Sequence, residues 1–226
     1  MRSPVIGITA NLVVDGKGRA RHEVKDTYIS AVRRAGGLPL MLPAIAEDRA
    51  AMLDAVDGVI MTGGDDIDTR SLGIPLHPKA EVMDPRRQAA EFALLQALDA
   101  RPEMPMLGIC LGMQLMGVHR GARLIQHLHD EFADGDRHRY DNVHPVRSSI
   151  GSGQVASWHH QAIADVRGFE VIGHSDDGII EAIRDPSRPF AVGVQWHPER
   201  TADAAMGDGI VRLVVDAARA AMACAR

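Results

Sequence analysis

The feature that most limits how this chain can fold is the alternation, in its first half, of short apolar runs with longer amphipathic segments. The apolar runs have the length of strands, and the segments between them repeat apolar residues at helical spacing. Such alternation predicts a doubly wound α/β fold, with a mostly parallel central sheet flanked by helices. The predicted strands are Pro4–Asn11, Leu38–Leu42, Gly58–Thr62 and Pro105–Ile109, and the predicted helices are Glu23–Ala35, Glu47–Ala55, Pro85–Ala100 and Leu111–Val118.

The second half follows a different pattern. The segment His127–Gly153 is rich in His, Asp, Arg, Ser and Gly, which predicts loop and irregular strand. The strands after it follow one another without long helices, so this edge of the sheet is expected to be antiparallel or mixed. No linker or repeat divides residues 1–226, which predicts a single domain. The later predicted elements are strands Phe169–Ile172, Ile179–Ile183 and Phe190–Val194, and a closing helix Ala204–Met222.

Composition excludes several classes of partner. The net charge of −5 and the lack of a Lys/Arg block argue against nucleic-acid binding. No segment reaches the roughly 20 apolar residues of a membrane span, and the N-terminal stretch lacks the pattern of a signal peptide. These features predict a cytoplasmic protein without a membrane partner. Two cysteines cannot form a disulfide framework in 226 residues, so reduced thiols are expected.

One of the cysteines lies in the pentapeptide Gly108-Ile109-Cys110-Leu111-Gly112, at the junction of a predicted strand and helix. A turn of this form strains the central residue, and the flanking glycines leave room for it. Cys110 would then face the start of a helix, where N–H groups favour a thiolate, and the Leu111 N–H would donate to an oxyanion. A buried core cysteine fits the pentapeptide equally well, so the motif alone leaves both interpretations open.

A second motif, Val192–Arg200, ends a predicted strand with a histidine. His197 is followed two residues later by Glu199, close enough to hold one imidazole nitrogen. A cysteine nucleophile needs a base within hydrogen-bond reach and a group that orients this base, and Cys110, His197 and Glu199 would supply the three roles. By itself, the motif fits a solvent-facing histidine beside a surface glutamate somewhat better.

A third strand end carries paired glycines. Gly64, with Gly63 as the next candidate, would bring a second backbone N–H to an oxyanion. The aspartates that follow suggest a calcium or magnesium loop, but the glycine and distal glutamate of such a loop are misplaced. A metal site is therefore not expected among Asp65, Asp66 and Asp68.

Together these motifs resemble the class I glutamine amidotransferase superfamily and, within it, the gamma-glutamyl hydrolases of the peptidase C26 type, typified by gamma-glutamyl-gamma-aminobutyrate hydrolase. The resemblance implies a flavodoxin-like sheet and a hydrolase that acts without a cofactor or metal on a small gamma-glutamyl amide. It spans residues 4 to about 200 and is carried by PVIGIT, RAGGLPLMLP, TGGDDID, DPRR, GICLGMQLM, ASWHHQAI, SDDGIIEAI and GVQWHPE.

The resemblance also implies residue roles. Cys110 would be the nucleophile, His197 the base and Glu199 its orienting group. Spacing alone gives the neighbouring histidines His159 and His160 a competing claim as the base, but in the family this pair shapes the pocket. Contacts to the glutamyl head group are implied for Gln114, Trp158, His159, His160 and Gln161.

Several positions depart from the family pattern. Leu111 replaces the usual arginine, Gln88 an aspartate and Ala156 an asparagine, and Arg147–Gln154 is short. We expect these departures to affect the substrate pocket, so the amine that is released stays open among polyamine derivatives, amino acids and short peptides. Two other functions also stay open, a glutaminase subunit that supplies ammonia to a separate synthetase and a non-catalytic binding protein. A homodimer is one option for assembly.

The 11 histidines of the chain raise the question of a metal centre. His127 and His129 would face the same way on a strand, as zinc ligands sometimes do. No cysteine or well-placed carboxylate completes a recognisable set of ligands, and the region is expected to be loop. His127, His129, His138 and His144 are therefore expected to be surface or pocket-rim residues.

Overall fold

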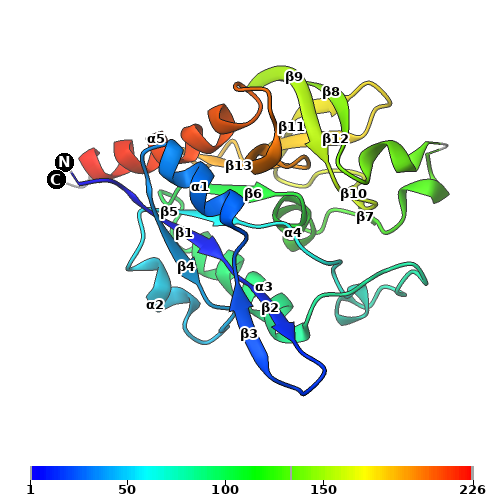
Figure 1. Ribbon diagram of the computed structural model, residues 1–226, viewed down its shortest axis with the longest axis horizontal. Helices are drawn as coiled ribbons and strands as arrows, with labels where there is room; N and C mark the ends of the chain where they lie inside the picture. Colours follow the sequence, from blue (N-terminus) through cyan, green and yellow to red (C-terminus); the bar gives the residue numbers. More distant parts are fainter. Residues whose placement is uncertain (1, 133, 225–226) are drawn as a thin grey trace.

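The computed structural model describes residues 2–132 and 134–224. Its centre is a nine-stranded sheet in the order β4-β1-β5-β6-β13-β12-β11-β8-β9 (Figure 1). The first five strands of this order pair in parallel, and the remaining pairings are antiparallel. The predicted fold is confirmed, including the antiparallel edge formed by the later strands. The strands are β1 (Val5–Thr9), β2 (Asn11–Val14), β3 (Ala20–Glu23), β4 (Leu38–Leu42), β5 (Gly58–Met61), β6 (Met106–Ile109), β7 (Leu124–Ile125), β8 (Asn142–Ser148), β9 (Gly151–Ser157), β10 (Ala162–Ile163), β11 (Glu170–Ser175), β12 (Ile180–Arg184) and β13 (Ala191–Val194).

Helices cover both faces of the sheet (Figure 1). Apolar residues of α1 and α5 pack on one face, and those of α2, α3 and α4 pack on the other. Among the described residues, no helix is both long enough and apolar enough to cross a membrane. The helices are α1 (Asp26–Arg34), α2 (Arg49–Leu53), α3 (Pro85–Asp99), α4 (Leu111–His119) and α5 (Asp208–Cys224), with short 3-10 turns η1 (Thr69–Leu72), η2 (Leu128–Asp130), η3 (Gly135–His138) and η4 (Pro198–Arg200).

Two hairpins differ from the sequence-based prediction. The predicted first strand is divided, because β2 leaves the sheet and pairs with β3 across a turn at Asp15–Arg19. Gly18 has φ +75° in this turn, a conformation that favours glycine. The β8–β9 hairpin occupies the segment predicted as loop and irregular strand. Its buried and exposed residues alternate, as expected where one face of an antiparallel sheet meets solvent.

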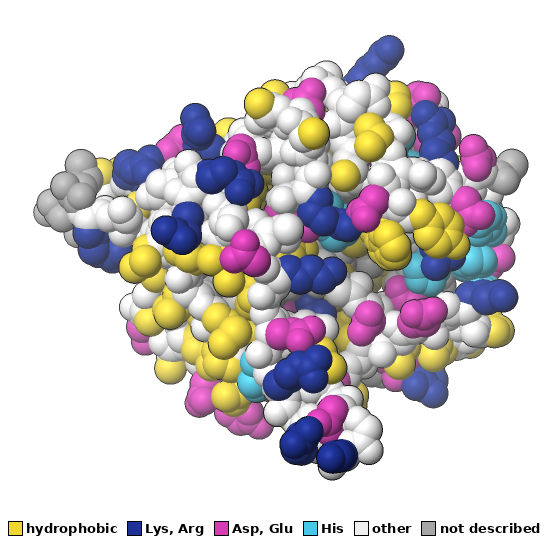
Figure 2. Space-filling view, viewed as in Figure 1, with side chains coloured by type: hydrophobic (Ala, Val, Ile, Leu, Met, Phe, Trp, Pro, Cys, Tyr) yellow, Lys and Arg dark blue, Asp and Glu magenta, His cyan; other side chains and the backbone are white. Residues whose placement is uncertain are grey.

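Strand β4 forms one edge of the large sheet and exposes apolar side chains. Leu38, Leu40 and Met41 are 56%, 40% and 47% exposed. Figure 2 shows hydrophobic side chains gathered at the lower left, over β4 and α2. A homodimer, one option for assembly, stays a prediction.

Candidate active site

The three motifs singled out in the sequence meet at the carboxyl ends of neighbouring strands. Strand β6 lies between β5 and β13, with Met61 opposite Gly108 and Ile109 opposite Val194. The Cys110 N–H donates to the Val194 carbonyl at 2.8 Å, which extends the pairing by one step. This register brings the glycine pair, the cysteine and the histidine segment together at the edge where α/β folds bind ligands.

Cys110 occupies a strained turn between β6 and α4. Its backbone has φ +52° and ψ −106°, although it is not a glycine, and its side chain is buried. Such conformations concentrate at functional sites, where the surrounding structure maintains them. The Cys110 Sγ lies 3.8 Å from the Trp158 carbonyl oxygen, and Leu111 begins α4 immediately behind it. The predicted elbow geometry is present.

The glycines on either side of Cys110 permit this turn by close packing. A Cβ atom at Gly108 would lie 2.5 Å from Met116 Sδ and 2.7 Å from the Gly112 carbonyl carbon. A Cβ atom at Gly112 would lie 2.4 Å from the Met61 carbonyl oxygen. Helix α4 therefore touches strands β5 and β6 through these two residues, and no larger residue fits.

Replacing Gly112 by alanine is expected to lower the free energy of unfolding by about 1–3 kcal/mol, the usual effect of overpacking a core. The clash involves backbone of β5, which cannot move without disturbing the sheet. Urea unfolding of the variant measures the change. Gly16→Ala is the matched control, because nothing lies within 4 Å of a Cβ at Gly16. Equal unfolding midpoints for the two variants would contradict the packing argument.

His197 and Glu199 form a buried pair beside Cys110. The His197 Nδ1–H donates to Glu199 Oε1 at 2.7 Å, and the two residues are 7% and 6% exposed. Burial lowers the pKa of His197, but the Glu199 carboxylate and the Cys110 thiolate outweigh it and raise this pKa to about 9. Burial raises the pKa of Glu199, whereas the His197 imidazolium lowers it more, to below its ordinary value. The arrangement therefore favours the imidazolium form of His197 beside Cys110.

Gly63 lies against both reactive side chains. A Cβ atom at this position would be 2.8 Å from His197 Cε1 and 3.5 Å from Cys110 Cβ. The Gly63 N–H donates to the Tyr28 hydroxyl oxygen at 3.0 Å, so this N–H is already engaged. Burial, and after it the Glu199 charge, raises the pKa of Tyr28 well above its ordinary value, which keeps the hydroxyl neutral. Of the two predicted oxyanion donors in this loop, the structure favours Gly64.

Arg87 of α3 holds the glycine loop from beneath. This side chain is fully buried, and its guanidinium donates to the Gly63 carbonyl at 2.9 Å. A Cβ atom at Gly64 would lie 2.0 Å from Arg87 Nη1, so the loop rests directly on the guanidinium. Arg87 belongs to the motif Asp84-Pro85-Arg86-Arg87, from which no role could be predicted for its side chain. The same guanidinium also donates to Asn11 Oδ1 at 2.9 Å and to Thr62 Oγ1 at 3.2 Å.

Two cavities meet at Cys110. The smaller has a volume of about 90 Å³ and is lined by all five residues predicted to contact the head group. The larger has a volume of about 550 Å³ and contacts His197 as well as Cys110. Gly64, Asp65 and Trp158 also border both cavities. Other polar residues line the smaller cavity (Asp66, Glu81, Arg139) and the larger one (Asn11, Glu23, Lys25, Arg200).

Hydrogen bonds hold the wall of the small cavity in place. Gln114 donates through Nε2 to the Gln161 carbonyl at 3.0 Å and to Gln195 Oε1 at 3.2 Å. Because its amide nitrogen is engaged, Gln114 can offer its amide oxygen to a ligand. His160 Nε2 contacts the Asp66 carboxylate at 2.9 Å, which ties the histidine pair to the segment after the glycines. Asp66 thus serves as a hydrogen-bond partner.

The departures from the family pattern lie outside both cavities. Leu111 is 1% exposed and packs in the apolar core. Gln88 accepts from the Asp68 N–H at 2.7 Å and donates to Ser71 Oγ at 2.8 Å, so it supports the loop at η1. Ala156 lines neither cavity. None of these three side chains therefore lines either cavity, and their effect on the substrate pocket stays a prediction.

The four histidines that were expected at the surface or pocket rim fall into two groups. His127 is half-buried and His129 is exposed, close to the predicted surface or rim placement, and Figure 2 shows histidine side chains gathered at the right. His138 and His144 are 0% and 1% exposed, so the same prediction is wrong for them. They surround Glu181, a charged residue inside the apolar run Ile179–Ile183. The signal for this cluster in the sequence is Glu181 itself, because a charged residue inside an apolar strand needs a buried partner.

Comparison with known proteins identifies the family. The model of the peptidase C26 family matches residues 4–199. A Mycobacterium tuberculosis protein named "Putative glutamine amidotransferase Rv2859c" is 36% identical over 220 residues, covering 88% of this chain and 71% of that protein. The protein named "Gamma-glutamyl-gamma-aminobutyrate hydrolase PuuD" of Escherichia coli K12 is 30% identical, covering 88% and 87% of the two chains. A solved structure described as a "putative gmp synthase subunit a protein" from Thermoplasma acidophilum shares the fold, with a TM-score of 0.68 at 16% identity and coverage of 99% and 98%. The chain belongs to the peptidase C26 family of glutamine amidotransferase-like hydrolases.

Proposed function

We propose that this protein is a cysteine hydrolase that cleaves gamma-glutamyl amides and releases glutamate. The observation that carries the proposal is the position of Cys110, a strained, buried thiol where two cavities meet, beside the buried pair of His197 and Glu199. A nucleophile, its base and the group that orients the base are thereby in contact. Covalent catalysis with these three residues needs no cofactor.

In the proposed reaction, the Cys110 thiolate attacks the gamma carbonyl carbon, and the N–H groups of Leu111 and Gly64 stabilise the oxyanion. The His197 imidazolium then transfers its proton to the leaving nitrogen as the C–N bond breaks, which leaves a gamma-glutamyl thioester. Neutral His197 next takes a proton from water, and the resulting hydroxide attacks the thioester carbonyl. Glutamate leaves, and the thiolate and imidazolium are restored.

The small cavity supplies groups suited to a glutamyl head. Arg139 can pair with the alpha carboxylate, and the acidic residues Asp65 and Glu81 can pair with the alpha ammonium. The amide oxygen of Gln114 accepts a further hydrogen bond from that ammonium. A substrate held in this way presents its gamma carbonyl to Cys110, which favours cleavage of the side-chain amide over an alpha-peptide bond.

The larger cavity suits the amine that is released. Its 550 Å³ is far more than ammonia requires, which favours an amine of several carbon atoms, such as a polyamine derivative or an amino acid. Lys25 and Arg200 on its wall can pair with a carboxylate at the far end of such an amine. The name of the E. coli relative specifies gamma-aminobutyrate, an amine of this kind.

Glutamine is the second candidate substrate. Several relatives carry the name glutamine amidotransferase, and glutamine has the same gamma-glutamyl head with ammonia as its leaving group. In that case a separate synthetase would use the ammonia, and the purified chain alone would hydrolyse glutamine only weakly.

A panel of substrates separates these possibilities. We expect kcat/KM for gamma-glutamyl-gamma-aminobutyrate to exceed that for glutamine by about 10-fold or more, because only the former fills the larger cavity. The alpha-linked isomer should give no glutamate. Lys25→Ala should raise KM for the gamma-aminobutyrate derivative and leave the kinetics of glutamine unchanged. If the protein hydrolysed glutamine and no other gamma-glutamyl compound, the result would favour the glutaminase. If no gamma-glutamyl compound released glutamate, the proposal would be overturned.

A further inference from the structure

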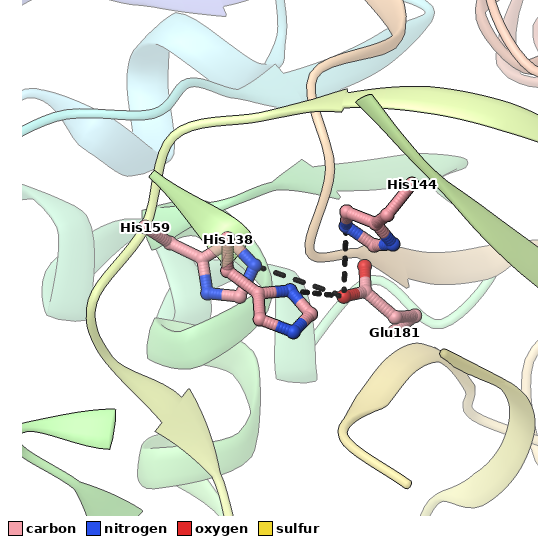
Figure 3. Close-up of side chains that lie close together, drawn as sticks. All are labelled: His138, His144, His159 and Glu181. Carbon is pink, nitrogen blue, oxygen red and sulfur yellow. Dashed lines mark ion pairs between the residues drawn. The ribbon is translucent and has the colours of Figure 1, made fainter. Parts of the chain in front are cut away.

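A buried cluster of histidines lies behind the wall of the small cavity (Figure 3). It joins His138 from η3, His144 from β8, His159 from the segment after β9 and Glu181 from β12. All four residues are at most 4% exposed. In Figure 3 the three imidazole rings converge on one oxygen of the Glu181 carboxylate.

The distances inside this cluster are too long for three good hydrogen bonds. Glu181 Oε1 lies 3.3 Å from His138 Nδ1, 3.6 Å from His144 Nε2 and 3.7 Å from His159 Nε2. Among the described residues, neither Glu181 oxygen has a hydrogen-bond partner, and neither has His138 Nδ1 or His159 Nε2. A buried carboxylate without a hydrogen bond is strongly unfavourable unless a cation compensates it.

Each imidazole has one nitrogen near Glu181 and one that points away from the cluster. The hydrogen bond made by the outer nitrogen determines whether the inner nitrogen carries a proton or a lone pair. In each histidine, the other ring nitrogen lies near a carboxylate or carbonyl oxygen to which an N–H can donate. In the neutral ring, the inward nitrogen then carries a lone pair directed at the cluster. Metal-bound histidines show this pattern, with the second N–H donated to a carboxylate or carbonyl. The outer contacts are His138 Nε2 to Asp177 Oδ2 at 2.8 Å, His159 Nδ1 to the Gln161 carbonyl at 2.9 Å and His144 Nδ1 to the Pro145 carbonyl at 3.4 Å.

We propose that His138, His144, His159 and Glu181 bind one Zn²⁺ ion. The four ligand atoms lie within 4.8 Å of one another. The three distances that meet at Glu181 Oε1, 3.3–3.7 Å, match the edges of a tetrahedron whose centre lies about 2.0–2.3 Å from each corner, close to the bond lengths of zinc to imidazole and carboxylate. Zinc binding would draw the three ring nitrogens, which lie at most 4.8 Å apart, to the same spacing. Ser157 Oγ lies 2.7 Å from His144 Nε2, and this hydrogen bond is given up when the metal binds.

The proposed site is structural, because protein groups supply all four ligands and burial excludes a water ligand. The ion would join η3, β8 and β12 to the segment 157–161, which forms the wall of the small cavity. His159 is both a ligand of the ion and a residue of that wall. Zinc would therefore hold the wall in place without taking part in the reaction proposed for Cys110.

The test measures metal content and does not depend on activity. The untagged full chain is refolded with and without Zn²⁺, and bound metal is quantified by mass spectrometry after gel filtration. We expect one zinc ion per chain, and after refolding with Co²⁺ the visible spectrum of four-coordinate cobalt. Glu181→Gln should lose the zinc ion.

A second pair of variants, with milder changes, tests the proposal even if Glu181→Gln misfolds. Asp177→Asn removes the charge of the carboxylate that accepts from His138 Nε2, and also from Ser175 Oγ, and should weaken zinc affinity by about 10–100-fold. Asp176→Asn, at an exposed neighbour that pairs with Arg137, should leave the affinity unchanged. Less than about a tenth of a zinc ion per wild-type chain after refolding with Zn²⁺ would overturn the proposal. Full zinc content in Glu181→Gln, or equal affinity in the two aspartate variants, would also overturn it.

Discussion

Replacing Cys110 by alanine is expected to reduce glutamate release from gamma-glutamyl amides by at least about 10⁴-fold, the scale on which loss of a nucleophile acts in other hydrolases. Alanine keeps a small side chain at the elbow but removes the atom that forms the thioester. The remaining N–H groups of Leu111 and Gly64 can still polarise a carbonyl, so a small residual rate above that of the uncatalysed reaction should remain. Initial rates of glutamate release with saturating substrate measure this loss.

Cys224→Ala is the matched control for this experiment. The second cysteine is exposed near the end of α5 and lines neither cavity at the active site. Its replacement should leave kcat and KM unchanged. If Cys110→Ala retained more than about a tenth of the wild-type rate, the thiol would not be the nucleophile. If the wild type and the variant were both inactive, the result would support the non-catalytic interpretation.

Replacing Glu199 by glutamine is expected to lower kcat/KM by about 10²–10⁴-fold, because the carboxylate orients His197 and stabilises its protonated form. The wild-type pKa of His197 is about 9. Since protonated His197 donates to the leaving amine, wild-type kcat/KM should hold up to about pH 9 and fall above it. Without the Glu199 charge, this basic limb should move down towards the ordinary value of 6.5. Profiles of kcat/KM against pH for the two proteins provide the measurement.

The same ion pair makes stability depend on pH. The folded-state pKa of His197 is raised, so its contribution is fully present below about pH 6.5 and is lost as the pH rises through about 9. The pKa of Glu199 is lowered, so its contribution is present above about 4.5 and is lost as the pH falls further. Wild type should therefore exceed Glu199→Gln in unfolding free energy mainly between these limits. Identical pH profiles for activity and stability in the two proteins would refute the pairing.

Much of this site was predictable because it lies where strands end. The runs before Gly63, Cys110 and His197 are apolar and short, so each predicts a buried strand with a polar residue or glycine at its carboxyl end. Parallel strands place such ends on one edge of the sheet. The sequence does not state that β6 lies between β5 and β13, and only this order brings the three ends into contact.

Other features depend on contacts that no local pattern encodes. Arg87 appears in the sequence as one of two adjacent arginines, and only the packing of α3 beneath the glycine loop shows that it holds the Gly63 carbonyl. Tyr28 likewise reads as an apolar position of a helix, although its hydroxyl accepts from Gly63. His138 and Glu181 are 43 positions apart and meet through the pairing of later strands, which composition alone could not predict. The side chain of Leu111 faces the core because α4 is buried on all sides.

The most direct test of the account is to detect the covalent intermediate on Cys110. The protein is mixed with gamma-glutamyl-gamma-aminobutyrate, quenched with acid and digested, and the peptide that contains Cys110 is analysed by mass spectrometry. The account predicts that this peptide gains the mass of one glutamyl group, that hydroxylamine removes the group, and that the peptide containing Cys224 is unchanged. The account would be contradicted if the protein released glutamate and samples quenched within the first turnover carried no adduct on Cys110.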